Sequence, residues 1–178
     1  KKFFLKIKST FEKISSEFYA LNRKLNFSKT LYGSQKGNKI TDIKTDLKKN
    51  LVYLDMDFSI STKGYSRGPH RDRDSRLINF LIYLNSLNKK DGAKLNLYNL
   101  KNKKINLKKK RFMSEKKLKL IKSLKPMAGK IIFFESAPNS YHSASNFYAK
   151  KVKKRYFIYG SYSLNKKVSW KMVNASNK

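Results

Sequence analysis

The chain contains no cysteine, which excludes a disulfide scaffold and any zinc site built on thiolates. It also lacks an apolar run long enough to cross a bilayer, so we expect no transmembrane segment. No internal repeat or linker divides the sequence, and its 178 residues suit a single domain with a real core. The chain opens on Lys1 rather than methionine, so we expect a trimmed N-terminus. The absence of cysteine is compatible with a reducing compartment, and we expect a cytoplasmic location.

Acidic residues are scarce. The chain holds 11 Asp and Glu against 43 Lys and Arg, which gives a formal net charge of +32. Such an excess attracts polyanions of any kind, whether nucleic acid, anionic lipid or acidic polysaccharide. The alternative explanation is a biased nucleotide composition, since the excess is mostly lysine and comes with abundant Asn and Ile. Both explanations stay open, and the charge predicts non-specific polyanion binding rather than a dedicated partner.

The apolar content is nevertheless that of a folded protein, with 39% hydrophobic and 13% aromatic residues. Residues 3–25 carry apolar side chains at steps of three and four, which predicts an amphipathic helix packed on the domain's own sheet. Residues 26–50 are polar and rich in lysine, which predicts a loop with at most short elements. We therefore expect a helix and loop over residues 1–50, a core over 51–164 and a C-terminal tail over 165–178.

The core region has the pattern of a series of short strands. Residues 51–60 alternate apolar and polar side chains, which is the two-residue period of a strand. Residues 118–124 are ambiguous between helix and strand. The other expected strands cover residues 76–84, 94–100, 130–135, 141–146 and 155–164. One helix followed by many short strands predicts a mainly β fold with flanking helices, a two-sheet antiparallel jelly roll of the cupin kind.

The chain has two histidines, and one of them begins the triplet His70, Arg71, Asp72. In an extended segment residues i and i+2 point to the same face, so His70 and Asp72 can turn their donor atoms toward one metal ion. The other histidine, His142, lies beside a second expected strand. Two histidines and one carboxylate on one face of an octahedron are typical of non-haem Fe(II) sites. The hypothesis is therefore a metal site of His70, Asp72 and His142.

A His-x-Asp triplet is a weak signal by itself, because it is short. His70 is also compatible with a surface histidine that pairs with Asp72 or Asp74. Asp74 is in addition a rival for the role of metal ligand, because the sequence reads HRDRD. Asp74 lies four residues from His70, which is too far along a strand or turn for the two side chains to meet at one metal ion, so the spacing favours Asp72.

The surroundings of the triplet carry a resemblance to a known family. An apolar strand ends in Tyr-Leu-Asn at Tyr83, and a Gly-x-x-Leu-x-Leu segment begins at Gly92. Residues 126–146 combine Pro-x-x-Gly, an apolar strand, a polar turn and His142. Over residues 51–164 the sequence resembles the 2-oxoglutarate- and Fe(II)-dependent oxygenases, and within them the prolyl 4-hydroxylase type. The resemblance implies a double-stranded β-helix with helices braced against one sheet.

The same resemblance implies a reaction and its partners. Fe(II) is expected on His70, Asp72 and His142, with 2-oxoglutarate as co-substrate, O2 as oxidant and ascorbate as an optional addition. The implied enzyme is a dioxygenase that hydroxylates an unactivated C–H bond of a prolyl, peptidyl or small-molecule substrate and releases succinate and CO2. A metal-holding cupin-like module without turnover is one alternative. A nucleic-acid-directed oxygenase is another, although Ser161 stands where those relatives carry a second arginine.

The resemblance also implies which residues bind 2-oxoglutarate. In this family an Arg or Lys on the strand after the distal histidine holds the far carboxylate, and guanidinium forks match carboxylates in two parallel hydrogen bonds. Arg155 heads the expected strand over residues 155–164, with Lys153 and Lys154 as rivals. Tyr83 matches a position where a tyrosine hydroxyl contacts the same carboxylate, and a purely structural tyrosine is the alternative.

Overall fold

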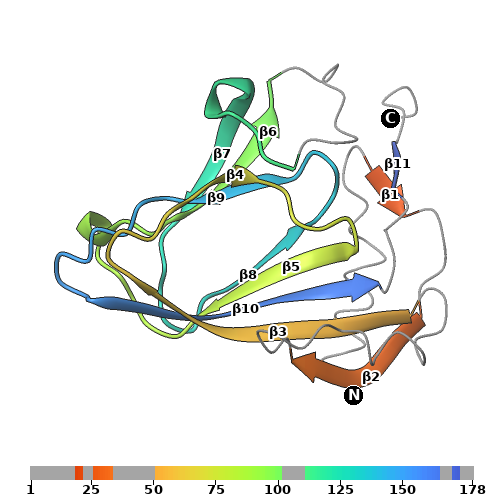
Figure 1. Cartoon of the computed structure of the whole chain (residues 1–178), viewed down its shortest axis with the longest axis horizontal. Helices are drawn as coiled ribbons and strands as arrows, with labels where there is room; N and C mark the ends of the chain where they lie inside the picture. The colour runs from red at the N-terminus through yellow and green to blue at the C-terminus, as the bar shows by residue number, and fades with distance from the viewer. Residues whose placement is uncertain (1–18, 22–25, 34–50, 102–110, 165–169, 173–178) are drawn as a thin grey trace.

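The computed structural model of the chain describes residues 19–21, 26–33, 51–101, 111–164 and 170–172. Two β-sheets lie face to face (Figure 1). The larger has the strand order β2-β3-β10-β5-β8, and the smaller has the order β4-β9-β6-β7. The fold is the mainly β, double-stranded β-helix expected from the sequence. The described residues add two short 3-10 helices, η1 (Lys89–Asp91) and η2 (Glu115–Lys117).

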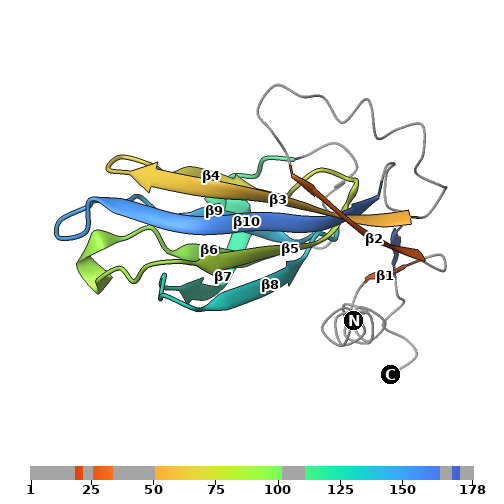
Figure 2. The same ribbon diagram turned by 90° about the horizontal axis from the view of Figure 1, so that it is seen from below.

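The larger sheet is organised around β10, which pairs antiparallel with β3 on one side and with β5 on the other. β5 is buried along nearly its whole length, as its almost continuous apolar sequence predicts. Figure 2 shows β3, β10 and β5 running side by side. The strands of this sheet are β2 (Asn26–Gly33), β3 (Leu51–Thr62), β5 (Arg76–Tyr83), β8 (Ile131–Glu135) and β10 (Lys154–Leu164).

The smaller sheet brings the two histidine-bearing segments together, because β4 and β9 are neighbours in it. β7, the segment whose pattern fits helix and strand equally, is an exposed edge strand. Its backbone pairing with β6 decides the conformation, which no local pattern reports. The strands are β4 (Arg67–His70), β6 (Leu95–Leu100), β7 (Leu118–Leu124) and β9 (Tyr141–Ala144).

An apolar cluster holds the two sheets against each other. Leu81 and Tyr83 of β5, Ile132 of β8 and Phe157 of β10 meet Leu95 from the smaller sheet. Full burial of one such side chain contributes on the order of 1.5–3 kcal/mol. This cluster therefore fixes the spacing of the two layers and leaves the space between them for a site.

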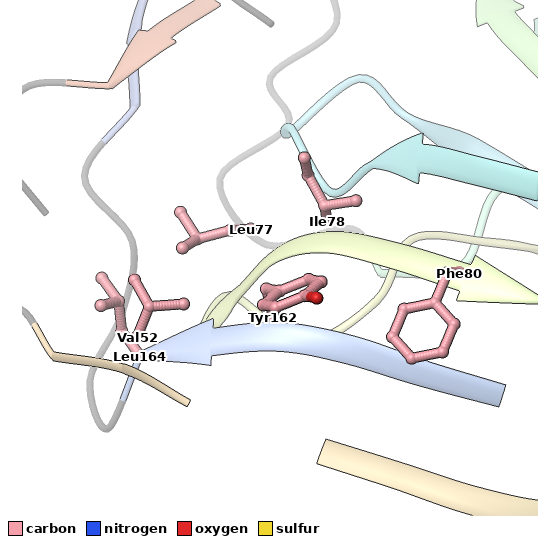
Figure 3. Close-up of a cluster of buried hydrophobic side chains, with 6 residues drawn as sticks. All are labelled: Val52, Leu77, Ile78, Phe80, Tyr162 and Leu164. Carbon is pink, nitrogen blue, oxygen red and sulfur yellow. The ribbon is translucent and has the colours of Figure 1, made fainter. Parts of the chain in front are cut away.

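A second cluster lies toward one end of the larger sheet and joins β3, β5 and β10 (Figure 3). The rings of Phe80 and Tyr162 are 6.1 Å apart within it. Gly160 lies on β10 directly opposite Phe80, and a Cβ at Gly160 would collide with the Phe80 ring. The glycine is thus required by the close approach of the ring. The members of the cluster are Val52, Leu77, Ile78, Phe80, Tyr162 and Leu164.

The two sides of β3 have opposite environments near its C-terminal end. Phe58 and Ile60 are 63% and 53% exposed, although they belong to the apolar side of the alternating pattern. Ser59 and Ser61 lie on the other side, where Ser59 lines a cavity and Ser61 is buried. The polar side of this strand therefore faces the interior between the sheets.

Two expectations for the N-terminal region are wrong where the structure describes it. Within the helix expected over residues 3–25, β1 (Tyr19–Leu21) is a strand that pairs antiparallel with β11 (Trp170–Met172) in the tail. Within the loop expected over residues 26–50, β2 pairs parallel with β3. Both strands are set by pairing with distant segments, which overrides a local pattern. The remaining parts of these two expectations lie outside the described residues. None of the described helices is long and apolar enough to span a membrane.

Candidate metal centre

His70 is the last residue of β4 and Asp72 lies two residues beyond the strand, and both side chains are buried. His70 donates a hydrogen bond from Nδ1 to the backbone oxygen of Gly68, at 2.9 Å. This bond fixes the ring and leaves Nε2 as the nitrogen with a free lone pair. A histidine whose second nitrogen donates to a carbonyl has the usual arrangement of a metal ligand.

His142 lies on β9 directly opposite His70, and the two ring centroids are 4.4 Å apart. Its Nε2 lies 3.3 Å from Oδ2 of Asp72. Each of the three residues offers one donor atom, and these atoms all lie within 4.8 Å of one another. The antiparallel pairing of β4 with β9 therefore brings together the three residues that the sequence nominated as metal ligands.

Burial sets the protonation of the two imidazoles. It lowers the pKa of His142 to about 3 and also lowers the pKa of His70. Both rings are therefore neutral near pH 7, and neutral imidazole is the form that binds a metal ion. Nδ1 of His142 is buried without a hydrogen-bond partner among the described residues.

The Asp72 carboxylate is held on both of its oxygens. Arg76 Nη1 lies 3.1 Å from Oδ1, and the Tyr159 hydroxyl donates to Oδ2 at 2.7 Å. Burial alone would raise the pKa of Asp72, but the neighbouring His142 and Arg76 and the Tyr159 hydrogen bond outweigh burial and lower it. The carboxylate is therefore ionised and oriented.

Arg76 and Tyr159 were not among the sequence candidates. The Arg76 guanidinium lies 5.0 Å above the Tyr159 ring and donates to its hydroxyl at 2.5 Å. Burial, reinforced by the Asp72 charge, raises the pKa of Tyr159, so this phenol stays protonated and donates. Two signals were present in the sequence. Tyr159 lies four residues after Arg155 and so shares its face of a strand, and Arg76 is a charge at the head of a buried run.

We predict that Tyr159→Phe weakens metal binding about tenfold or more, because residues that orient a metal ligand usually contribute 10–100-fold in affinity. The phenyl ring remains, so the fold is retained. The measurement is an anaerobic titration with Fe(II) or Mn(II), followed by calorimetry. Tyr156→Phe is the matched control, since Tyr156 faces the other side of β10 and stacks on Phe58. Equal affinities in the two variants would mean that Arg76 alone orients Asp72.

Asp74, the rival carboxylate, does not belong to the cluster of donor atoms formed by His70, Asp72 and His142. It pairs with Arg71 at 2.7 Å, and its side chain is 37% exposed. The group of donor atoms contains Asp72 instead.

Arg155 is the one residue of the three cation candidates that reaches the interior. It is 4% exposed, whereas Lys153 and Lys154 lie on the surface. Its Nε donates to Ser61 Oγ at 3.2 Å and its Nη1 to the Ala93 carbonyl at 2.9 Å. No carboxylate of the described residues forms an ion pair with this buried guanidinium.

Tyr83 lies near Arg155 and is fully buried. Its hydroxyl has no hydrogen-bond partner among the described residues. Burial raises the pKa of Tyr83 to about 12, so the hydroxyl is a neutral donor. An unpaired buried donor beside an unpaired buried cation is costly unless a polar ligand satisfies both.

A cavity of about 150 Å³ connects the two histidines of the candidate metal site with Arg155 and Tyr83. His70, His142 and Tyr159 line it, as do Arg155 and Tyr83. The rest of its wall is apolar or weakly polar, apart from one further cation, Arg67. These other lining residues are Ser59, Tyr65, Arg67, Leu81, Leu95, Phe134, Ser143, Ala144 and Phe157.

The solved structures that resemble this chain include three prolyl hydroxylases. A prolyl-4-hydroxylase from Pseudomonas putida has 19% identity and a TM-score of 0.44, covering 64% of this chain and 52% of its own. A prolyl hydroxylase from Trichoplax adhaerens, solved with a hypoxia inducible factor peptide fragment, has 22% identity and a TM-score of 0.44, covering 61% and 42%. A prolyl 4-hydroxylase from Phytophthora capsici has 16% identity and a TM-score of 0.41, covering 62% and 31%. The chain thus spans about half or less of the lengths of these proteins.

A search of curated protein sequences gives no match. The sequence profile of the 2OG-Fe(II) oxygenase superfamily, by contrast, matches residues 56–162, which is more than half of the chain. This match includes all strands from β4 to β9, the C-terminal part of β3 and most of β10. The chain belongs to the 2OG-Fe(II) oxygenase superfamily.

Proposed function

We propose that this protein is a 2-oxoglutarate- and Fe(II)-dependent dioxygenase that hydroxylates an unactivated C–H bond and releases succinate and CO2. The observation that carries the proposal is one cavity with a ligand-binding group at each end. At one end His70 and His142 line the cavity and, with Asp72 beside them, offer three donor atoms within 4.8 Å of one another. At the other end the Arg155 guanidinium is buried, and no carboxylate of the described residues forms an ion pair with it. A metal ion and a dicarboxylate would satisfy both ends.

The metal end suits Fe(II). His70, Asp72 and His142 would hold the ion, and a set of two imidazoles and one carboxylate leaves coordination positions open for other ligands. Bound Fe(II) would supply the activation of O2 coupled to oxidative decarboxylation of 2-oxoglutarate. The protein's own contribution is to keep the Asp72 carboxylate ionised and oriented through Arg76 and Tyr159.

The other end suits the far carboxylate of 2-oxoglutarate. Arg155 would bind it through the guanidinium, which is already held in place by Ser61 and Ala93. The Tyr83 hydroxyl would donate to the same group, which gives it the partner that it otherwise lacks. Leu81, Leu95 and Phe157 supply apolar walls around this end, which exclude water and strengthen the ion pair.

The cavity is small compared with the 300–1,000 Å³ typical of sites for drug-sized ligands. Its volume of about 150 Å³ suits a co-substrate of the size of 2-oxoglutarate. The substrate would therefore approach with its reactive carbon at the mouth of the cavity. A prolyl peptide or a small molecule is the proposed class, with ascorbate as an optional addition to the reaction.

The test is succinate release by purified protein with Fe(II), 2-oxoglutarate and a pooled panel of peptides, amino acids and nucleic acids. We expect succinate in amounts that depend on the peptide pool and that vanish when a chelator removes the iron. Fe(II) binding without succinate over the whole panel would instead support a cupin-like module without turnover. Dependence on nucleic acid would favour the nucleic-acid-directed reaction. Ser161 opposes this outcome, since it is fully buried beside Ser163 and provides no second cation.

A further inference from the structure

Arg67 is the first residue of β4; it lines the cavity and is exposed to solvent. It lies opposite Ala144 of β9, while His70 lies opposite His142. β4 thus advances by three residues where β9 advances by two. This register shift marks a β-bulge or similar irregularity between Arg67 and His70.

This irregularity places Arg67 on the metal-facing side of the strand. In a regular strand residues i and i+3 point to opposite faces. His142 and Ala144 are two residues apart and so share one face, and residues opposite them share it too. Arg67 and His70 therefore both face the cavity, and all four residues line it.

The cavity wall contains two guanidinium groups and no carboxylate side chain. The proposed function assigns the buried one, Arg155, to 2-oxoglutarate. Arg67 differs from it because it is exposed. Among the described residues, no acidic side chain forms an ion pair with Arg67. It is therefore a charge that remains available to a molecule arriving from outside.

The segment that carries Arg67 is held in place. The Gly64 amide donates to the Phe147 carbonyl at 2.9 Å, and the Phe147 amide donates to the Tyr65 carbonyl at 2.9 Å. Phe147 is fully buried, so these two bonds tie the segment to the core. The Tyr65 side chain is 37% exposed and lines the cavity beside Arg67. The backbone that leads to Arg67 is thus held in place next to an exposed ring, which lowers the cost of ordering this segment on binding.

We propose that Arg67 is a substrate-binding residue, and that the substrate is a peptide with an anionic group next to the carbon that is hydroxylated. This inference rests on the proposed function, in which 2-oxoglutarate binds inside the cavity at Arg155. The substrate would then approach from the solvent side, where Arg67 lies. A guanidinium binds carboxylate and phosphate alike through charge-assisted hydrogen bonds. The register of β4 sets Arg67 beside both histidines, so the anion lies within a residue or two of the reacting position.

The experiment measures binding rather than turnover, which separates its outcome from that of the proposed function. Protein loaded with Zn(II) and 2-oxoglutarate is titrated with fluorescent proline-containing peptide pools. The pools come in matched pairs that differ only beside the proline: Glu against Gln, and phosphoserine against serine. We expect the wild-type protein to bind each anionic pool about tenfold or more tightly than its neutral partner, the effect of one hydrogen-bonded charge pair. We expect Arg67→Glu to reverse this preference and Arg67→Lys to keep part of it.

The matched control is Arg73→Glu, which changes the net charge equally at an exposed position outside the cavity wall. If Arg67 itself binds the anionic group, Arg73→Glu must preserve the preference for anionic pools, because it lowers the net charge by the same amount without changing the cavity wall. An equal loss in both variants overturns the proposal and assigns the preference to the whole surface. Weaker binding of 2-oxoglutarate in Arg67→Glu with an unchanged pool preference also overturns it, since Arg67 then serves the co-substrate. Failure of all anionic pools to bind the wild-type protein overturns the peptide class.

Discussion

Replacing His142 with alanine is expected to abolish iron-dependent succinate release, and the same holds for His70→Ala and Asp72→Ala. The chain has two histidines, so no neighbouring imidazole can replace either one. Residues that only orient a metal ligand typically contribute 10–100-fold in affinity, so loss of a ligand itself should exceed that range. The measurement combines succinate release with an anaerobic metal titration, because a structural role of His142 would change stability without removing the metal site.

Asp74→Ala is the matched control for the carboxylate. Asp74 lies two residues after Asp72 and pairs with Arg71 outside the group of donor atoms. Its loss should leave metal affinity and turnover nearly unchanged and affect stability little, since partly exposed ion pairs contribute about 0–1 kcal/mol. Full activity of His142→Ala, or loss of activity in Asp74→Ala alone, would contradict the assignment of the three ligands.

The three proposed ligands could be nominated from the sequence because histidine is rare in this chain. With only two candidates, the spacing of His70 and Asp72 and a strand beside His142 were sufficient. The pairing of β4 with β9, which brings the two histidines opposite each other, is a long-range contact. The expectation that the two histidine-bearing segments meet through sheet pairing came from the barrel-like fold that the resemblance implies, and not from any local pattern.

The alternating pattern of β3 identified a strand but not the face that lines the site. Apolar alternation usually marks the side that faces the core. Here Phe58 and Ile60 are exposed, and the side that carries Ser59 and Ser61 faces the interior. A site that binds a metal ion and a dicarboxylate needs polar walls, so the usual rule fails at such a strand.

The cavity-facing position of Arg67 and the strands β1 and β2 could not be predicted from the sequence for a related reason. Arg67 faces the cavity because of one register shift between β4 and β9, which no local sequence pattern reports. β1 and β2 exist because of partners at the other end of the chain or across a sheet edge. Local propensity contains no information on such pairings, and tertiary contacts override it.

Arg155→Ala is expected to raise the KM for 2-oxoglutarate about thirtyfold or more. The guanidinium is buried, and its removal would leave the far carboxylate of the co-substrate buried without the cation that is proposed to bind it. Truncating one partner of a buried hydrogen-bonded charge pair typically costs about 2–5 kcal/mol, and every 1.4 kcal/mol is tenfold in affinity. Metal affinity should stay nearly the same, because Arg155 lies outside the group of donor atoms.

Three further variants make this test specific. Arg155→Lys keeps the positive charge but loses the two parallel hydrogen bonds of the guanidinium. Its affinity for 2-oxoglutarate should therefore lie between those of the wild-type protein and Arg155→Ala. Lys153→Ala and Lys154→Ala remove exposed cations that precede Arg155 on the chain, and both should leave the KM unchanged. Arg155 also bonds Ser61 and Ala93, so thermal melting of each variant must accompany the kinetics. A raised KM in either lysine variant, with Arg155→Ala unaffected and folded, would move the carboxylate anchor to that lysine. A KM defect in Arg155→Ala that excess 2-oxoglutarate corrects would identify the guanidinium as the anchor rather than as a brace for β10.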